Sequence, residues 1–143
     1  KIKKCSIKLK HENVLKLMKN FVLRVKKNKK NIVNFINKQI RKGKKIFLYG
    51  ASTKGNTFLQ YYNLNNKKIP FAAEKTPSKW GRYTIGTGIE IISEKEARKL
   101  NPDYFLVTPW AFIKEFVKRE KNWLKSGGCF ILPFPRLKLI KKQ

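Results

Sequence analysis

The chain of 143 residues is poor in the residues on which many enzymes and metal sites depend. It has one histidine, two cysteines and one methionine, and only eight Asp and Glu stand against 35 Lys and Arg. With His11 as the sole imidazole, histidine-based catalysis has little material. Cys5 and Cys129 are too far apart in sequence for a metal knuckle, and we expect two free thiols in a reducing compartment. We therefore expect no catalytic residue and no metal ligand in this chain.

Long apolar runs are missing too. No stretch approaches the roughly 20 residues that span a bilayer, and no signal-peptide pattern is present, so we predict a cytoplasmic protein that binds no membrane. Hydrophobic residues make up 41% of the chain, which is enough to bury the core of one ordinary domain. The first residue is Lys1 and not Met, so a longer original polypeptide stays open.

The formal net charge of +27 favours contact with polyanions, including nucleic acid at low salt. However, 29 of the 35 basic residues are Lys, whereas bidentate recognition of bases and phosphates favours Arg. Twelve Asn accompany the Lys excess along the whole length, which indicates compositional drift more than a selected patch. We expect no specific nucleic-acid partner, and a nonspecific nucleic-acid-binding basic protein is the third interpretation of the chain.

The first part of the chain is helical by its apolar spacing. Residues 12–42 carry two amphipathic patterns, and Gly43 is well placed to end the second. The Lys-rich faces opposite those patterns are typical of solvated helix surfaces. The first pattern comprises Val14, Met18, Phe21, Val22 and Val25, and the second comprises Ile32, Ile36 and Ile40.

From residue 44 onward, strand-like runs alternate with helical segments, which predicts a parallel sheet. Ser93 with Glu96 forms a capping box. Right-handed crossovers give a mostly parallel five-stranded sheet of order 3-2-1-4-5 in a Rossmann-like, three-layer α/β domain. We thus divide the chain into an N-terminal helical segment, 1–43, and a Rossmann-like nucleotide-sugar-binding domain, 44–143. The predicted strands are 45–49, 69–74, 88–92, 103–108 and 128–132, and the predicted helices are about 54–63, 93–100 and 111–124.

Residues 45–59, reading KIFLYGASTKGNTFL, have the pattern of a buried strand, a glycine turn and a helix. Gly50 allows the tight turn, and Gly55 lets the helix approach the sheet closely. The first turn of such a helix exposes free backbone amides, which bind phosphates. Ser52 replaces the second glycine of a dinucleotide fingerprint, and no P-loop spacing is present, so a tight turn without a ligand stays open. Side-chain donors near this turn are Ser52, Lys54, Asn56 and Thr57.

Three further segments are expected at the same edge of the sheet. Glu74 ends the second strand 24 residues after Gly50, where an acidic side chain can accept hydrogen bonds from ribose hydroxyls. The following loop supplies Lys79 and Arg82 as cations, and Trp110 follows the fourth strand, where a packing role is equally open. The predicted substrate-binding residues are Gly50, Ser52, Lys54, Gly55, Asn56, Thr57, Glu74, Lys79, Arg82 and Trp110.

Several separated motifs over residues 12–140 resemble the C-terminal domain of the sugar-nucleotide C-methyltransferases, which methylate C3 of a dTDP-linked keto sugar with S-adenosylmethionine. The chain departs from the family pattern at Glu74-Lys75-Thr76, which stands for Asp-Arg-Asn, at Ile85, which stands for Pro, and at Ala111, which stands for Asn. The motifs are Tyr49-Gly-Ala-Ser-Thr-Lys-Gly-Asn-Thr57, Pro77-Ser-Lys-Trp-Gly-Arg-Tyr83, Gly86-Thr87, Pro102-Asp-Tyr104, Pro109-Trp110, Gly127-Gly128 and Pro133-Phe-Pro135.

The resemblance implies a substrate-side domain of a methyltransferase in deoxysugar biosynthesis. Such a domain forms one wall of the cleft for the nucleotide-sugar, while S-adenosylmethionine and the catalytic residues belong to another domain of the same polypeptide or to a partner chain. We then expect no cofactor bound by this chain alone and no catalytic competence without that domain. The alternative hypothesis is a nucleotide- or NAD-binding regulatory module that uses Glu74 on a ribose.

Overall fold

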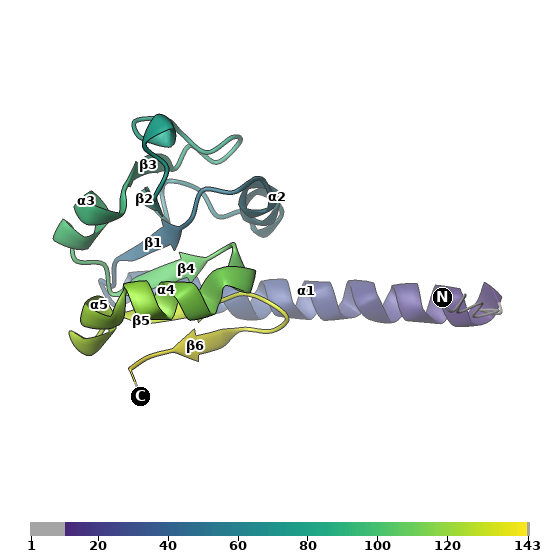
Figure 1. Cartoon of the computed structure of the whole chain (residues 1–143). Helices are drawn as coiled ribbons and strands as arrows, with labels where there is room; N and C mark the ends of the chain where they lie inside the picture. The colour runs from purple at the N-terminus through teal and green to yellow at the C-terminus, as the bar shows by residue number, and fades with distance from the viewer. Residues whose placement is uncertain (1–10, 143) are drawn as a thin grey trace, which may run out of the picture.

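The computed structural model describes residues 11–142, which form one sheet with helices on both faces (Figure 1). The six strands lie in the order β3-β2-β1-β4-β5-β6. The first five are parallel and follow the predicted order, whereas β6 runs antiparallel to β5. The bounds are β1 Ile46–Tyr49, β2 Phe71–Glu74, β3 Glu90–Ser93, β4 Tyr104–Val107, β5 Cys129–Leu132 and β6 Lys138–Ile140.

The predicted count of five strands was therefore wrong by one. The proline-rich turn of residues 133–135 reverses the chain, and Lys138–Ile140 then pairs with β5, the strand that would otherwise have been the edge. A three-residue strand that begins with Lys138 and is followed by Lys141 has too little apolar alternation to be found by pattern. Its short length and its lysines are typical of an edge strand that does not recruit further strands.

The helices also differ from prediction in two places. The two amphipathic patterns of residues 12–42 form one continuous helix, since no residue between them breaks it. The single helix predicted at 111–124 is divided into three pieces, because α-helical geometry is left at Phe112, with φ −94° and ψ 12°, and at Glu120, with φ −97° and ψ 24°. The helices are α1 His11–Arg41, α2 Thr53–Tyr62, α3 Glu94–Lys99, α4 Ile113–Arg119 and α5 Lys121–Lys125, and the 3-10 turns are η1 Pro77–Lys79 and η2 Trp110–Phe112.

The three layers follow from the alternation of side chains along each strand. In β1, Ile46 and Leu48 join a core cluster with α1 and α2, whereas Phe47 and Tyr49 join a second cluster with α3, α4 and α5. All four residues are buried, as expected for a central strand covered on both faces. The sheet is thus fixed on both faces, and its carboxyl edge is left to the loops.

Helix α1 is only half embedded in this body. Ile32 and Ile36 are fully buried beneath the sheet, whereas Met18 and Phe21 are about 60% exposed on the part that extends away from it (Figure 1). The domain boundary at residue 43 stays a prediction, although the second half of α1 packs into the core of the α/β unit. None of the helices formed by residues 11–142 is long and apolar enough to cross a membrane.

Candidate functional site

The site predicted from the sequence centres on the turn between β1 and α2. The hydroxyl of Ser52 caps α2 by accepting a hydrogen bond from the Gly55 amide at 3.1 Å. The first intrahelical bond runs from the Asn56 amide to the Ser52 carbonyl at 3.0 Å. The amides of Thr53 and Lys54 precede that bond and have no acceptor within the helix. Both residues are exposed, which is compatible with binding of a ligand by these amides.

Both glycines of the turn serve close packing against the end of β4. A Cβ on Gly50, whose φ is +85°, would lie 2.7 Å from the ring of Pro109. A Cβ on Gly55 would lie 2.7 Å from the hydroxyl of Thr108, which donates to the Gly50 carbonyl at 3.0 Å. Side chains at either position would therefore push the turn away from β4. The predicted reasons for these glycines, a tight turn and a close helix approach, agree with this geometry.

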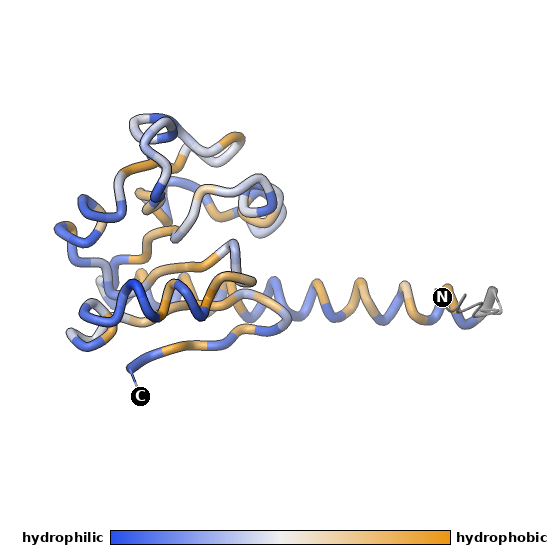
Figure 2. Tube along the Cα trace, in the orientation of Figure 1, coloured by the Kyte–Doolittle hydropathy of each residue, from blue (hydrophilic) through white to orange (hydrophobic). Residues whose placement is uncertain are grey.

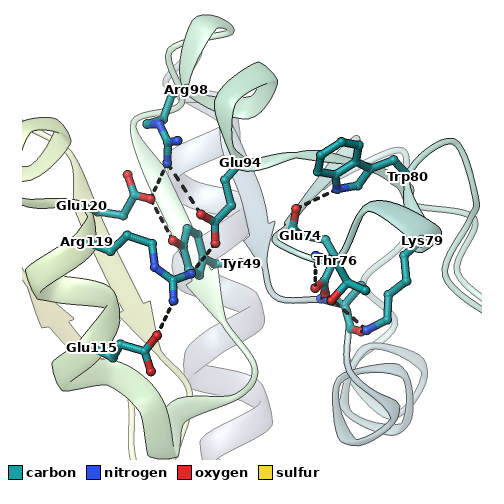
Figure 3. A network of polar contacts seen from close by, with 11 residues as sticks. Tyr49, Glu74, Thr76, Lys79, Trp80, Glu94, Arg98, Glu115, Arg119 and Glu120 are labelled. Carbon is teal, nitrogen blue, oxygen red and sulfur yellow. Dashed lines mark hydrogen bonds and ion pairs between the residues drawn. The ribbon is translucent and has the colours of Figure 1, made fainter.

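Glu74 joins the β1–α2 turn to the loop after β2 (Figure 3). One carboxylate oxygen accepts from the Ala51 amide at 2.9 Å, and the other accepts from the Thr76 amide at 3.0 Å. The ammonium of Lys79 lies 3.5 Å from the carboxylate and donates to the Ala51 carbonyl at 3.0 Å. The indole of Trp80 donates to the Glu74 carbonyl at 2.8 Å. These contacts hold the backbone around the tip of α2, and a ribose contact by Glu74 stays a prediction.

The surroundings of Glu74 keep its carboxylate charged. Burial raises the pKa of Glu74, but hydrogen bonds from the Thr76 and Ala51 amides, together with the Lys79 charge, outweigh that effect and lower the pKa below its ordinary value. The carboxylate is therefore ionised at neutral pH. Because it is only 8% exposed, its charge acts mainly on the turn and the loop that it joins.

The structure brings most of the other predicted residues to the same edge. Lys79 contacts the turn directly, and Trp110 follows the Pro109 that packs on Gly50; the Trp110 ring centroid lies 4.8 Å from that of Phe134. Arg82 is exposed on the loop after η1, where its backbone amide donates to the Lys79 carbonyl at 3.2 Å. In α2, Thr57 is exposed and Asn56 is half-buried. Binding by each of these side chains stays a prediction.

Electrostatics distinguishes the tip of α2 from that of α3. Both helices are capped by a serine, Ser52 in α2 and Ser93 in α3, and each hydroxyl accepts from the amide three residues later. The first turn of α3 carries Glu94 and Glu96, whereas the first turn of α2 carries no acid and contains Lys54. Carboxylates neutralise the positive end of a helix dipole, and the first turn of α2 has none, which favours anions there. The carboxylate of Glu74, which accepts from the Ala51 amide beside this tip, is paired with Lys79.

A comparison with known proteins supplies the family. The model of the C-methyltransferase C-terminal domain matches residues 8–135. This chain belongs to that family. C-methyltransferase NovU of Streptomyces niveus is 36% identical over 101 residues, which cover 71% of this chain. The aligned part covers 24% of NovU, so the match spans about a quarter of that relative's length.

Membership confirms the coarser part of the resemblance, namely a C-terminal domain of a C-methyltransferase. The family match ends at residue 135, so β6 lies beyond it. The α2 tip and the loop after β2 lie within the matched region.

A second buried carboxylate, Glu120, was missed by the sequence analysis. It is 1% exposed and accepts hydrogen bonds from the Tyr49 hydroxyl at 2.8 Å and from Arg98 at 2.6 Å (Figure 3). Burial and the neighbouring Glu120 charge raise the pKa of Tyr49, so the phenol keeps its proton and donates. A usable signal was the spacing of Glu120 from Phe116 and Trp123, because this spacing places an acid on the apolar face of the predicted helix.

The remaining reactive groups are a cysteine and the potential metal ligands of residues 11–142. Cys129 is a free, buried cysteine, and burial raises the pKa of its thiol. No three His, Cys, Asp or Glu side chains of this part of the chain gather in a way that could hold a metal ion. Cys5, the other predicted free thiol, lies outside the described residues.

Proposed function

We propose that this C-methyltransferase domain binds a nucleotide-linked keto sugar, with the diphosphate at the tip of α2. The observation that carries the proposal is the Ser52-capped tip of α2, whose first turn contains no acid and includes the exposed residues Thr53 and Lys54, at the carboxyl edge of a parallel sheet. Ligands of open α/β sheets bind at that edge, and anions bind at such helix ends. Family membership supplies the reaction class but leaves the identity of the sugar and the nucleotide to experiment.

The neighbouring side chains suit the parts of such a ligand. Diphosphate oxygens would accept from the Thr53 and Lys54 amides, and Lys79 and Arg82 add positive charge beside them. Trp110 offers an aromatic face to a sugar or base. Glu74 contributes by holding the turn and the loop in place, since its hydrogen bonds to backbone amides fix the path of both segments.

The methyl donor belongs to another domain in this proposal. S-adenosylmethionine, when bound, supplies the methyl group, and the base that forms the enolate is placed with it. We assign this chain the tasks of binding and orienting the sugar in the cytoplasm, together with a donor domain in the same polypeptide or in a partner chain.

Calorimetric titration with dTDP- and UDP-linked sugars at moderate salt tests the proposal. The double variant Ser52→Ala with Lys54→Ala should bind at least about tenfold more weakly, because it loses the helix cap and one charge. The matched control is Ser93→Ala with Lys95→Ala, which makes the same changes at the same positions of α3. The control should bind as the wild type does. Equal affinity of the wild type and the α2 variant would refute binding at this turn.

A second candidate is nonspecific binding of polyanions, which one surface feature favours. A groove of about 940 Å³ lies between α4, α5 and β6, and its lining includes the apolar residues Leu124 and Ile140. Binding there should weaken steeply with salt and show little preference among nucleic-acid sequences. Affinity that survives moderate salt would argue for a specific ligand instead. The lysines that line this groove are Lys118, Lys121, Lys125, Lys138, Lys141 and Lys142.

A further inference from the structure

Helix α1 has two halves with different surroundings. In the second half, Ile32 and Ile36 are 0% exposed in the core, and the Asn28 amide donates to the Pro133 carbonyl at 2.8 Å. The first half leaves the body of the domain, and there Met18 is 61% and Phe21 59% exposed. Hydrophobic side chains concentrated on an exposed helix mark an interaction surface.

The exposed apolar residues continue the buried face of the same helix. At about 3.6 residues per turn, Val14, Met18, Phe21 and Val25 lie close to whole turns before Ile32. We call these four exposed or half-buried residues the α1 stripe. Figure 2 shows hydrophobic positions along one side of the projecting helix and hydrophilic positions along the other. The stripe and the buried isoleucines therefore face the same direction, and the domain covers that face of α1 only in part. The exposed Leu15 and Leu23 lie outside the stripe, about 120° and 200° around the helix from Phe21.

The charge around the stripe has a single sign. Residues 13–27 contain no Asp or Glu, so a surface that covers the stripe gains from an acidic rim. A second copy of α1 would instead bring two rows of cations together, in chains whose formal charge is +27 each. Charge thus disfavours self-association and favours an acidic occupant. The cations of this segment are Lys16, Lys19, Arg24, Lys26 and Lys27.

The shape of the molecule distinguishes a protein domain from a membrane. Ile32 and Ile36 pack beneath the sheet and α2, so the domain stands on the same face of α1 as the stripe. A flat bilayer that reached Phe21 would collide with the domain beside it (Figure 1). A second globular body seated next to the sheet meets no such obstacle. The occupant is therefore compact, apolar at its centre and acidic at its rim.

We propose that the α1 stripe docks into an apolar, acid-rimmed groove of the methyltransferase domain that works with this C-terminal domain. One helix is then shared by two domains, with its second half in the α/β core and its first half in the neighbour. The identity of the occupant rests on the proposed division of labour between a donor domain and this one. The inference that the α1 stripe is an interaction surface rests only on the exposure of its residues, their positions around the helix and the surrounding charge.

Photo-crosslinking in the native polypeptide, at its natural length and in its own cells, tests the docking. A benzoylphenylalanine at position 21 should crosslink to an Asp- or Glu-containing segment of the methyltransferase domain, identified by mass spectrometry of the linked peptides. Position 23 is the matched control, because Leu23 is equally exposed at 63% but lies about 200° around the helix from Phe21. The crosslink yield at 21 should exceed that at 23 by at least about tenfold.

Three outcomes would overturn the inference: equal yields at the two positions, a crosslink to the same helix of a second copy, or a crosslink to phospholipid. Phe21→Glu should abolish a crosslink from position 18, whereas Leu23→Glu should leave it unchanged. Neither change touches the tip of α2, so calorimetric binding of the nucleotide-sugar by the 143-residue chain should not change. Failure of the proposed function would appear in that titration and failure of docking in the crosslinks, so the two are distinguishable.

Discussion

The two buried carboxylates of this domain, Glu74 and Glu120, are held by different kinds of partner. Glu120 accepts from the side chains of Tyr49 and Arg98, which come from a strand and a helix far away in sequence. Glu74 accepts mainly from the backbone amides of Ala51 and Thr76, which belong to loops. Glu120 thus fastens helices to the sheet, whereas Glu74 fixes the course of the chain at the carboxyl edge.

These different partners indicate which of the two acids matters for stability and which matters for the site. A carboxylate paired with side chains on packed elements contributes to the fold as a whole. A carboxylate that binds backbone amides positions the segments to which those amides belong. In this domain those segments are the β1–α2 turn and the loop that carries Lys79. Mutations of the two acids should therefore separate stability from binding.

The largest effect is expected for Glu120→Ala. The change leaves the buried Tyr49 hydroxyl without its acceptor and removes the partner of Arg98, so we expect a loss of about 2–4 kcal/mol in the free energy of unfolding. Urea denaturation followed by circular dichroism measures it. Glu115→Ala is the control, since this residue is 58% exposed and pairs with Arg119 at the surface, where the loss should stay below about 1 kcal/mol. Similar losses in both variants would contradict the role given to Glu120.

Glu74→Ala should give a smaller loss of stability, about 1–3 kcal/mol, because several lost bonds involve loop amides that water can reach. Of the two substitutions, Glu74→Ala should have the larger effect on binding. With the turn no longer tied to the Thr76 segment, nucleotide-sugar affinity should fall at least about tenfold in calorimetry. Glu120→Ala should retain near wild-type affinity under conditions in which it is folded. A lower nucleotide-sugar affinity of Glu120→Ala than of Glu74→Ala would contradict the roles given to the two acids.

Gly55→Ala tests the contact between the turn and β4. The added methyl group would lie 2.7 Å from the Thr108 hydroxyl, so we expect a destabilisation of about 1–3 kcal/mol by urea denaturation. Combining it with Thr108→Ala removes the hydroxyl that the added methyl group would contact. The double variant should then lose less stability than the sum of the losses of the two single variants. Additive losses would show that the cost of Gly55→Ala does not come from contact with the Thr108 hydroxyl.

The smallest effect is a pH dependence. The pKa of Glu74 is lower in the folded chain than its ordinary value of 4.5, so its contribution to stability is present above that pH. The contribution is lost as the pH falls through the lowered pKa. The stability difference between wild type and Glu74→Gln, measured by urea denaturation, should therefore shrink between pH 6 and pH 3. A difference that stays constant over this range would show that the charge of Glu74 is unimportant.

Local patterns predicted the regular part of the molecule well. Strand order follows from alternating segments and crossover handedness, and the serine caps of α2 and α3 are visible in the sequence. Helix periodicity did not predict the break at Glu120, whose carboxylate accepts from Tyr49 and Arg98, two residues distant in sequence. The hydrogen bonds from backbone amides to the Glu74 carboxylate were also not predictable from local pattern, since the paths of loops are set by tertiary contacts.

The uninterrupted course of α1 has a consequence for its evolution and engineering. Because the rod spans about 46 Å without a break, the angular phase of Phe21 is locked to that of Ile32. Inserting a single residue near position 27 would rotate the residues upstream of it by roughly 100° about the helix axis. Inserting seven would lengthen the helix by about 10 Å and nearly restore the original angular position of Phe21. Homologous helices should accordingly tolerate length changes of whole heptads and reject single-residue ones.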